Sequence, residues 1–167
     1  MDRIEDHLSG MSWDQIEKSE EVSRFLIGIA SKHPQIGSIW LVDADGRPRS
    51  TNFHHASART ISLADRDYMQ AFRSGQRGLF VGETVIGKIS GRPAFNIARP
   101  KLLKDGTLDG AVVLAAHPSY FARFYEQVAL ALNHSAGLVR SDGIFLVRDA
   151  VAKASVDQHR AVRRQVI

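Results

Sequence analysis

The 167-residue sequence contains no cysteine and no long apolar run. Without cysteine, the chain has no disulfide scaffold, no thiolate nucleophile, no cysteine-ligated zinc and no iron–sulfur cluster. No stretch approaches the roughly 20 apolar residues of a transmembrane helix, and the charged N-terminus lacks the apolar region of a signal peptide. We therefore expect that nothing in this sequence inserts into a membrane, and that any spans of the natural protein lie outside it.

Charge of one sign is also scarce in this sequence. The 22 Lys and Arg residues stand against 18 Asp and Glu, which leaves a net charge of +4. Basic residues gather near the C-terminus without interleaved aromatic residues or a DNA-binding motif, at Lys153, Arg160, Arg163 and Arg164. The sequence therefore predicts no nucleic-acid partner, and its 44% hydrophobic content predicts a folded domain with a core.

Patterns that would indicate catalysis or metal binding do not hold. The stretch Gly82–Lys88 has the spacing of a phosphate-binding loop, but its residues 84–86 are β-branched and favour a strand, and Ile89 replaces the magnesium-binding hydroxyl. Adjacent residues on a strand point to opposite faces, so His54 and His55 do not chelate one ion. No G-x-S-x-G pattern exposes a serine. We predict no enzyme activity, no metal and no cofactor.

A long N-terminal helix is predicted over residues 12–31. A capping-box pattern at Ser12 and Gln15 begins it, apolar residues recur at helical spacing, and a following proline ends it. The N-terminal half of this helix is almost wholly polar, so we expect Trp13 and Ile16 to face a partner. This favours a homodimer through the helix.

The rest of the sequence alternates strand and helix patterns. Asp45-Gly46 is typical of a tight hairpin turn. A short helix is predicted between Ser62 and Gly75, and an amphipathic helix begins at Pro118. Strands are predicted at residues 38–42, 79–86, 93–98 and 108–116. The sequence therefore predicts an α+β protein with an antiparallel meander.

The first hairpin has an echo later in the chain. The pattern S-x-x-L-V-x-x-D-G begins at Ser38 and again at Ser135, which indicates two related units. The second unit has only a hairpin, residues 138–148, and a basic helix, so it is partial. The alternative is that hairpins reuse the same turn residues by chance.

Charged and aromatic residues gather where a loop enters the short middle helix. Arg66 offers a planar fork of donors suited to a carboxylate, and Tyr68 adds a ring and a hydroxyl. Asp65 and His54 lie in the sequence that precedes this helix, and we count both among the candidate ligand-binding residues. The alternative is that Arg66 pairs with Asp65 or Asp67 at the surface while Tyr68 belongs to the core.

The strand over residues 95–99 is predicted to face this segment. Successive side chains of a strand point to opposite faces of the sheet, so Phe95 and Arg99 lie on one face and Asn96 and Ala98 on the other. We expect Phe95, Asn96, Arg99 and the loop of His54 to close over a ligand held by Arg66 and Tyr68.

Several of these motifs together resemble the double Cache sensor domains of bacterial transmembrane receptors. Their order and spacing match across most of residues 37–128. The residues that carry the resemblance are Asp65-Arg66-Asp67-Tyr68-Met69, Ile89-Ser90-Gly91-Arg92-Pro93, Ile97-Ala98-Arg99-Pro100, the run 105–113 and Tyr120-Phe121-x-x-Phe124-Tyr125.

The resemblance implies an organisation and a location. A signalling helix would occupy residues 1–34, a membrane-distal PAS-like domain residues 35–132, and part of a membrane-proximal unit residues 133–167. Such domains lie in the periplasm, between the transmembrane helices of inner-membrane histidine kinases, diguanylate cyclases or chemoreceptors. The resemblance therefore implies a ligand sensor that is anchored to the membrane in the full-length protein.

The amino-acid-binding branch of this family binds the ligand carboxylate with an R-x-W-Y-x-x-A motif and the amine with a later strand aspartate. Arg66 and Tyr68 match the Arg and Trp positions, but Met69 and Phe72 depart from the motif. The strand over residues 110–117 has no acid, and a buried ammonium without an anion is costly. We expect a small anionic or neutral polar ligand, a carboxylate before an α-amino acid.

Two other functions remain open. A cytosolic PAS- or GAF-like regulatory module would share the sheet but would carry haem or flavin and no flanking membrane spans. An enzyme would require a base within reach of a nucleophile.

Overall fold

The structure is a computed structural model that describes residues 1–53, 58, 60–132 and 136–148. It forms two compact units, one over Met1–Ala116 and a second that begins at His117. The domain boundaries suggested at residues 34 and 132 stay predictions.

The first unit is built on a five-stranded antiparallel sheet. Its strands stand in the order β2-β1-β5-β4-β3. Their bounds are β1 Ile36–Asp43, β2 Pro48–Thr51, β3 Phe80–Ile86, β4 Pro93–Leu102 and β5 Leu108–Ala116. The predicted meander β3-β4-β5 is present, with β4 longer than expected, and the α+β class is confirmed.

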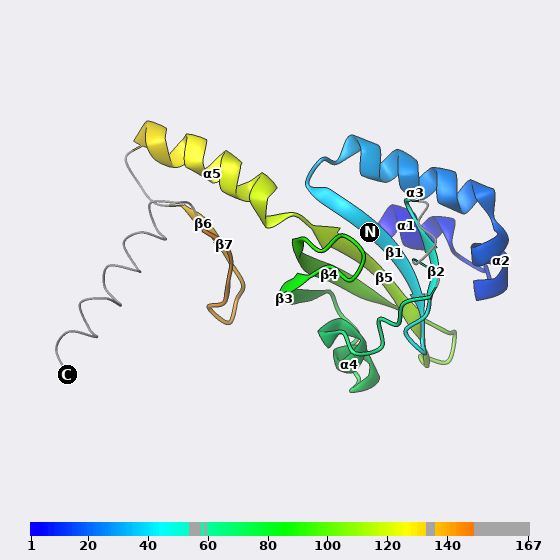
Figure 1. Cartoon of the computed structure of the whole chain (residues 1–167). Helices are drawn as coiled ribbons and strands as arrows, with labels where there is room; N and C mark the ends of the chain where they lie inside the picture. The colour runs from blue at the N-terminus through cyan, green and yellow to red at the C-terminus, as the bar shows by residue number, and fades with distance from the viewer. Residues whose placement is uncertain (54–57, 59, 133–135, 149–167) are drawn as a thin grey trace. The chain divides into compact units, whose positions relative to one another are not determined.

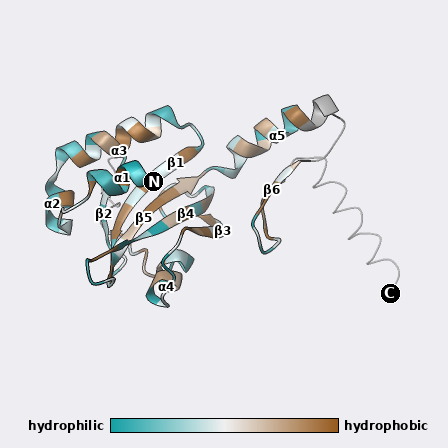
Figure 2. Ribbon diagram, turned by 180° about the vertical axis from the view of Figure 1, so that it is seen from behind, coloured by the Kyte–Doolittle hydropathy of each residue, from teal (hydrophilic) through white to brown (hydrophobic). Residues whose placement is uncertain are grey.

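Both faces of this sheet are covered, and strand alternation divides the core between them. Ile39 and Leu41 of β1 belong to the cluster that packs under the N-terminal helices, whereas Trp40 and Val42 belong to the cluster on the opposite face. Figure 1 shows α1–α3 on one side of the sheet and α4 on the other. Hydrophobic colour accordingly runs along the central strands, and the turns are hydrophilic (Figure 2).

The N-terminal segment contains three helices, α1 (Asp2–His7), α2 (Trp13–Lys18) and α3 (Glu20–Lys32). The predicted capping box is present: the Ser12 side chain accepts from the Gln15 backbone N–H, and the Gln15 side chain accepts from the Ser12 N–H. The single helix predicted over residues 12–31 is wrong. Ser19 is extended, with φ −83° and ψ 110°, and its hydroxyl caps Val22, so it ends α2 and begins α3.

The expectation that Trp13 and Ile16 face a partner is also wrong. Ile16 is fully buried against the sheet. The Trp13 indole N–H donates to the backbone and side-chain oxygens of Asp109, at 2.8 and 2.9 Å, and its ring stacks under the Lys101 ammonium. The packing of α2 against the sheet therefore uses both residues inside one chain.

The opposite face of the sheet is covered by α4 (Asp67–Arg73), which begins later than the predicted helix start at Ser62. Tyr68, Met69 and Phe72 of this helix are buried. They pack on strand residues of β1, β4 and β5. We call this the α4 face of the sheet, and the other the α1–α3 face.

The second unit contains α5 (Pro118–Leu132), β6 (Gly137–Val139) and β7 (Phe145–Arg148). The two strands pair as the predicted second hairpin. Gly46 and Gly143 occupy equivalent turn positions with φ +86° and +87°, so the echo in the sequence extends to the backbone. The basic helix predicted after residue 148 lies outside the described residues. No helix in the described part of the chain is long and apolar enough to span a membrane.

Candidate functional site

The α4 face carries two buried polar side chains among apolar ones. Tyr68 of α4 is only 2% exposed and packs within the cluster formed with Trp40, Ala98 and Val113. Asn96 of β4 is 8% exposed. Because side chains two residues apart on a strand share a face, Asn96 lies on the α4 face with Ala98.

The Tyr68 hydroxyl is an uncharged polar group within the core cluster. Burial raises the pKa of this phenol, and the nearby Arg66 guanidinium opposes that rise only partly. The side chain is therefore a neutral phenol at physiological pH, able to donate and to accept. Within the described residues its hydroxyl has no hydrogen-bond partner.

The Asn96 amide is the second such group. It forms no side-chain hydrogen bond to any described residue. Neither amide atom is among the fully buried polar atoms without a partner, so the amide keeps some contact with solvent and is able to hydrogen-bond to a small molecule. Tyr68 and Asn96 thus place two polar groups, each without a described hydrogen-bond partner, on one apolar face.

Arg66 supplies a positive charge that acts on the Tyr68 phenol. It stands at the N-cap of α4, and its guanidinium donates to the Ile86 backbone oxygen at 3.1 Å. It pairs with neither neighbouring acid. Asp65 is held by Lys88 at 2.6 Å, and Asp67 accepts from the backbone N–H groups of Tyr68 and Glu83. The alternative in which Arg66 forms a surface ion pair with Asp65 or Asp67 is therefore not what the structure contains, whereas its other part, a Tyr68 that belongs to the core, is.

Arg66 differs in this from Arg49, Lys88, Arg99 and Lys101, which form ion pairs with carboxylates. It resembles Arg73 and Arg77, whose guanidinium groups donate to backbone oxygens. Arg66 forms no ion pair with any described residue, so its charge is free to attract an anion. The strand residues of the Tyr68 cluster are all uncharged, namely Trp40, Val42, Ala98, Ala111 and Val113.

Arg99 and Phe95 are not brought to this site. The Arg99 guanidinium forms ion pairs with Asp2 and Glu5 of α1, so it lies on the α1–α3 face. Phe95 pairs with Ala116 and shares the alternation of Arg99. Their predicted closure over the ligand of Arg66 and Tyr68 has no support from this placement. His54 lies outside the described residues.

Sequence reasoning missed Trp40 and Lys88. The Trp40 ring lies in the Tyr68 cluster, perpendicular to Phe53 at 5.1 Å, with its indole N–H bonded to Ser38. The alternation of β1 carried this information, since Trp40 shares its face with Val42. Lys88 had no such signal, because its partner Asp65 lies 23 residues away.

No metal site accompanies these groups in the part of the chain that the structure describes, where no three His, Asp or Glu residues gather. The arrangement offers a cation, a phenol and an amide over an apolar floor. These groups have the hydrogen-bonding chemistry to bind a small polar molecule, and among them is no nucleophile with an adjacent base.

No family model and no curated protein matches the chain. Solved structures do. The extracellular domain of the histidine kinase rpHK1S-Z16 superposes with a TM-score of 0.72 at 26% identity, over 87% of this chain and 60% of that one. The ligand-binding domain of the Campylobacter jejuni chemoreceptor Tlp3, in complex with 4-methylisoleucine, gives 0.61 at 11% identity, over 88% and 58%.

A third similar structure is the ligand-binding domain of the Pseudomonas aeruginosa PAO1 chemoreceptor PctC in complex with GABA. It gives a TM-score of 0.58 at 16% identity, over 87% of this chain and 66% of that one. The chain thus spans less than two thirds of each of these domains. All three are sensor or ligand-binding domains and not catalytic domains, and the chain has the PAS-like fold of Cache sensor domains.

Proposed function

We propose that this chain is the periplasmic sensor domain of a membrane-anchored bacterial signalling receptor and binds a small carboxylate in preference to an α-amino acid. The observation that carries the proposal is the Arg66 charge, which has no acidic partner among the described residues, beside the buried phenol of Tyr68 and amide of Asn96. A carboxylate satisfies all three, since it accepts from a guanidinium, a hydroxyl and an amide.

The preference against α-amino acids follows from the same residues. Asp65 and Asp67, the acids nearest Arg66 in the sequence, are already bonded to Lys88 and to backbone N–H groups. Strand β5, which packs against Tyr68 through Ala111 and Val113, has no acid over residues 110–116. An ammonium buried against this strand would lack a counter-charge, which costs more than the added contacts return.

A matched set of small molecules tests this function. We expect millimolar propionate to raise the melting temperature of the purified domain, and alanine, which adds an ammonium to the same skeleton, to leave it unchanged. The measurement is a thermal-shift assay over two- to six-carbon carboxylates, each run beside its amino acid. A set in which only the amino acids stabilise the domain would rule the carboxylate preference out.

The assay also separates this function from its main alternative. A cytosolic PAS- or GAF-like module that holds haem or flavin would show absorbance in the visible range after purification. Absorbance of that kind, together with no response to any carboxylate, would favour the regulatory module.

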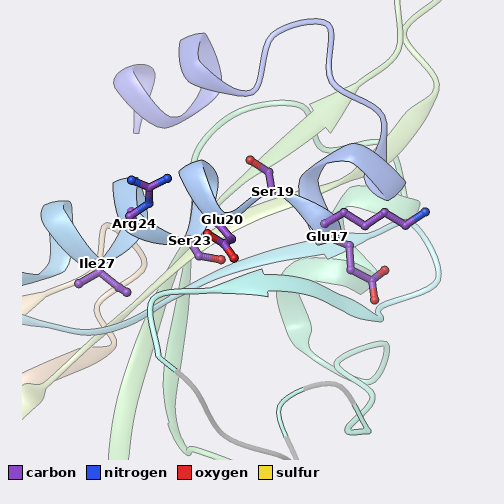
Figure 3. Close-up of a pocket in the computed structure, with 7 residues that line it drawn as sticks. Glu17, Ser19, Glu20, Ser23, Arg24 and Ile27 are labelled. Carbon is purple, nitrogen blue, oxygen red and sulfur yellow. The ribbon is translucent and has the colours of Figure 1, made fainter.

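A homodimer through the N-terminal helices belongs to the same proposal, although Trp13 and Ile16 do not support it. A groove of about 650 Å³ lies where α2 ends and α3 begins. Figure 3 shows the acidic and basic side chains that line it. The lining residues are Glu17, Lys18, Ser19, Glu20, Ser23, Arg24 and Ile27. In a two-fold pairing, Arg24 of one copy would meet the acids of the other.

Ile27 provides the test of this dimer, because it is 39% exposed on the groove. We expect Ile27→Asp combined with Arg24→Glu to weaken self-association about tenfold, since the double change removes apolar contact and adds like-charge repulsion. Sedimentation equilibrium measures the effect. Arg47→Glu, at an exposed position in the β1–β2 turn, is the control. Equal weakening by Arg47→Glu, or no weakening by the double variant, would exclude this groove as the interface.

A further inference from the structure

The turn between β3 and β4, residues 87–92, folds back over the α4 face. Its one apolar side chain, Ile89, packs against the cluster that contains Tyr68. Its other residues are polar or glycine. The turn is thus attached to the site at a single apolar point.

Two basic side chains tie this turn to the segment that leads into α4. The Lys88 ammonium donates to the Asp65 carboxylate at 2.6 Å and to the Ser62 backbone oxygen at 2.7 Å. Arg66 donates to the Ile86 oxygen at the base of the turn. The hydrogen bond from Lys88 lowers the pKa of the Asp65 carboxyl, so this carboxylate stays charged and the ion pair persists at neutral pH.

The turn is internally bonded. The Gly87 N–H donates to the Arg92 oxygen, and the Gly91 N–H donates to the Gly87 oxygen, both at 2.9 Å. Its outward attachments are the contacts of Lys88, Arg66 and Ile89. An exposed ion pair contributes little to stability, so this attachment is weak enough to open and close.

The site itself requires such an opening. Tyr68 and Asn96 are only 2% and 8% exposed, so a molecule larger than water has little access to either side chain while the surrounding segments stay in place. The guanidinium that would bind an anion is the one that holds the base of the turn. Ligand capture and turn position are therefore linked through Arg66.

We propose that Lys88 is a positioning residue, whose bonds to Asp65 and Ser62 hold the 87–92 turn closed over the binding site. The turn is a lid that opens at its β3 and β4 ends to admit a small anion. This inference rests on the proposed function for what the lid admits, but the lid motion itself is measurable without any ligand.

Tyrosine nitration of the ligand-free protein provides that measurement. The chain has three tyrosines, of which Tyr68 is buried and Tyr120 and Tyr125 lie in the second unit. Under tetranitromethane, followed by peptide mass mapping, we expect Lys88→Gln to nitrate Tyr68 about threefold faster than the natural chain. The rates of Tyr120 and Tyr125 should not change, which makes them internal references.

Matched variants separate the lid from other causes. Asp65→Asn should accelerate Tyr68 nitration as much as Lys88→Gln, although the two change the net charge in opposite directions, and the double variant should add nothing further. Arg92→Gln removes an exposed charge from the same turn and should have no effect. Unchanged nitration in Lys88→Gln, or equal acceleration in Arg92→Gln, would overturn the proposal.

Two further arms keep the outcome clear. If Lys88→Gln does not fold, 1 M NaCl applied to the natural chain should accelerate Tyr68 nitration by screening the Lys88–Asp65 pair, and no response to salt counts against the lid. With propionate as probe, Lys88→Gln should raise association and dissociation rates together, about threefold each. Accelerated nitration without propionate binding in any variant would leave the lid standing and contradict the carboxylate site.

Discussion

Alanine in place of Gly110 is expected to lower the free energy of unfolding by about 3 kcal/mol. A Cβ at this position would overlap the Val42 backbone oxygen of the neighbouring strand and the ring of Trp13, and it would also crowd Asp43. Strand β1 cannot move away, because β1 and β5 are paired along their length. The Trp13 ring cannot move away either, because its indole N–H is bonded to Asp109. Urea denaturation followed by tryptophan fluorescence measures the loss.

Gly28→Ala is the matched control for this prediction. Gly28 lies inside α3, and nothing lies within 4 Å of where its Cβ would be. The change should therefore stabilise the chain by up to about 1 kcal/mol, since alanine has the higher helix propensity. If both variants move stability in the same direction by the same amount, the close approach at Gly110 is not what holds α2 to the sheet.

The Gly110 contact matters because it joins the two faces of the sheet. Trp13 binds at the start of β5 from the α1–α3 face, and Val113 of the same strand packs with Tyr68 on the α4 face. A ligand that shifts the α4 face acts on a strand to which α2 is bonded. The sheet offers a direct physical route from the site to the helices, although it transmits only as much free energy as the ligand's differential affinity provides.

Local sequence patterns predicted most elements of this fold. The strand bounds 108–116, the Asp45-Gly46 turn and the capping box at Ser12 all depend on neighbours within a few residues, and all are present. The helix break at Ser19 was not predicted, because it depends on more than the neighbouring residues. Serine is tolerated inside a helix and also caps one, and the choice depends on how α2 packs against the sheet.

The site was only partly predictable. Arg66, Tyr68 and Asn96 carry the chemistry that the sequence suggested, and alternation already set Asn96 apart from Arg99. The alternation of side chains along a strand separates the two faces of the sheet, but it does not show which face α4 covers. The acids of α1 that bind Arg99 lie more than 90 residues away, so no local pattern reveals them.

Arg66→Ala is expected to weaken propionate binding by about 10- to 100-fold, the range for loss of a hydrogen bond to a charged group. The domain should remain folded, because the described contact of this guanidinium is one hydrogen bond to the Ile86 oxygen. The propionate affinity of Arg66→Lys should lie between those of the natural chain and Arg66→Ala, since lysine keeps the charge but lacks the planar guanidinium. Isothermal titration calorimetry at low salt gives the affinities, and a circular dichroism melt checks the fold.

The sharper readout is the ratio of propionate to propionamide affinity, because the two ligands have the same shape and differ in charge. In the natural chain we expect propionate to bind at least tenfold more tightly, and in Arg66→Ala we expect the two to bind equally. Arg92→Ala, at an exposed arginine of the β3–β4 turn, should preserve the preference for the anion. An unaltered ratio in Arg66→Ala would mean that the charge selecting the ligand lies elsewhere, and the site would have to be rebuilt around Tyr68 and Asn96 alone.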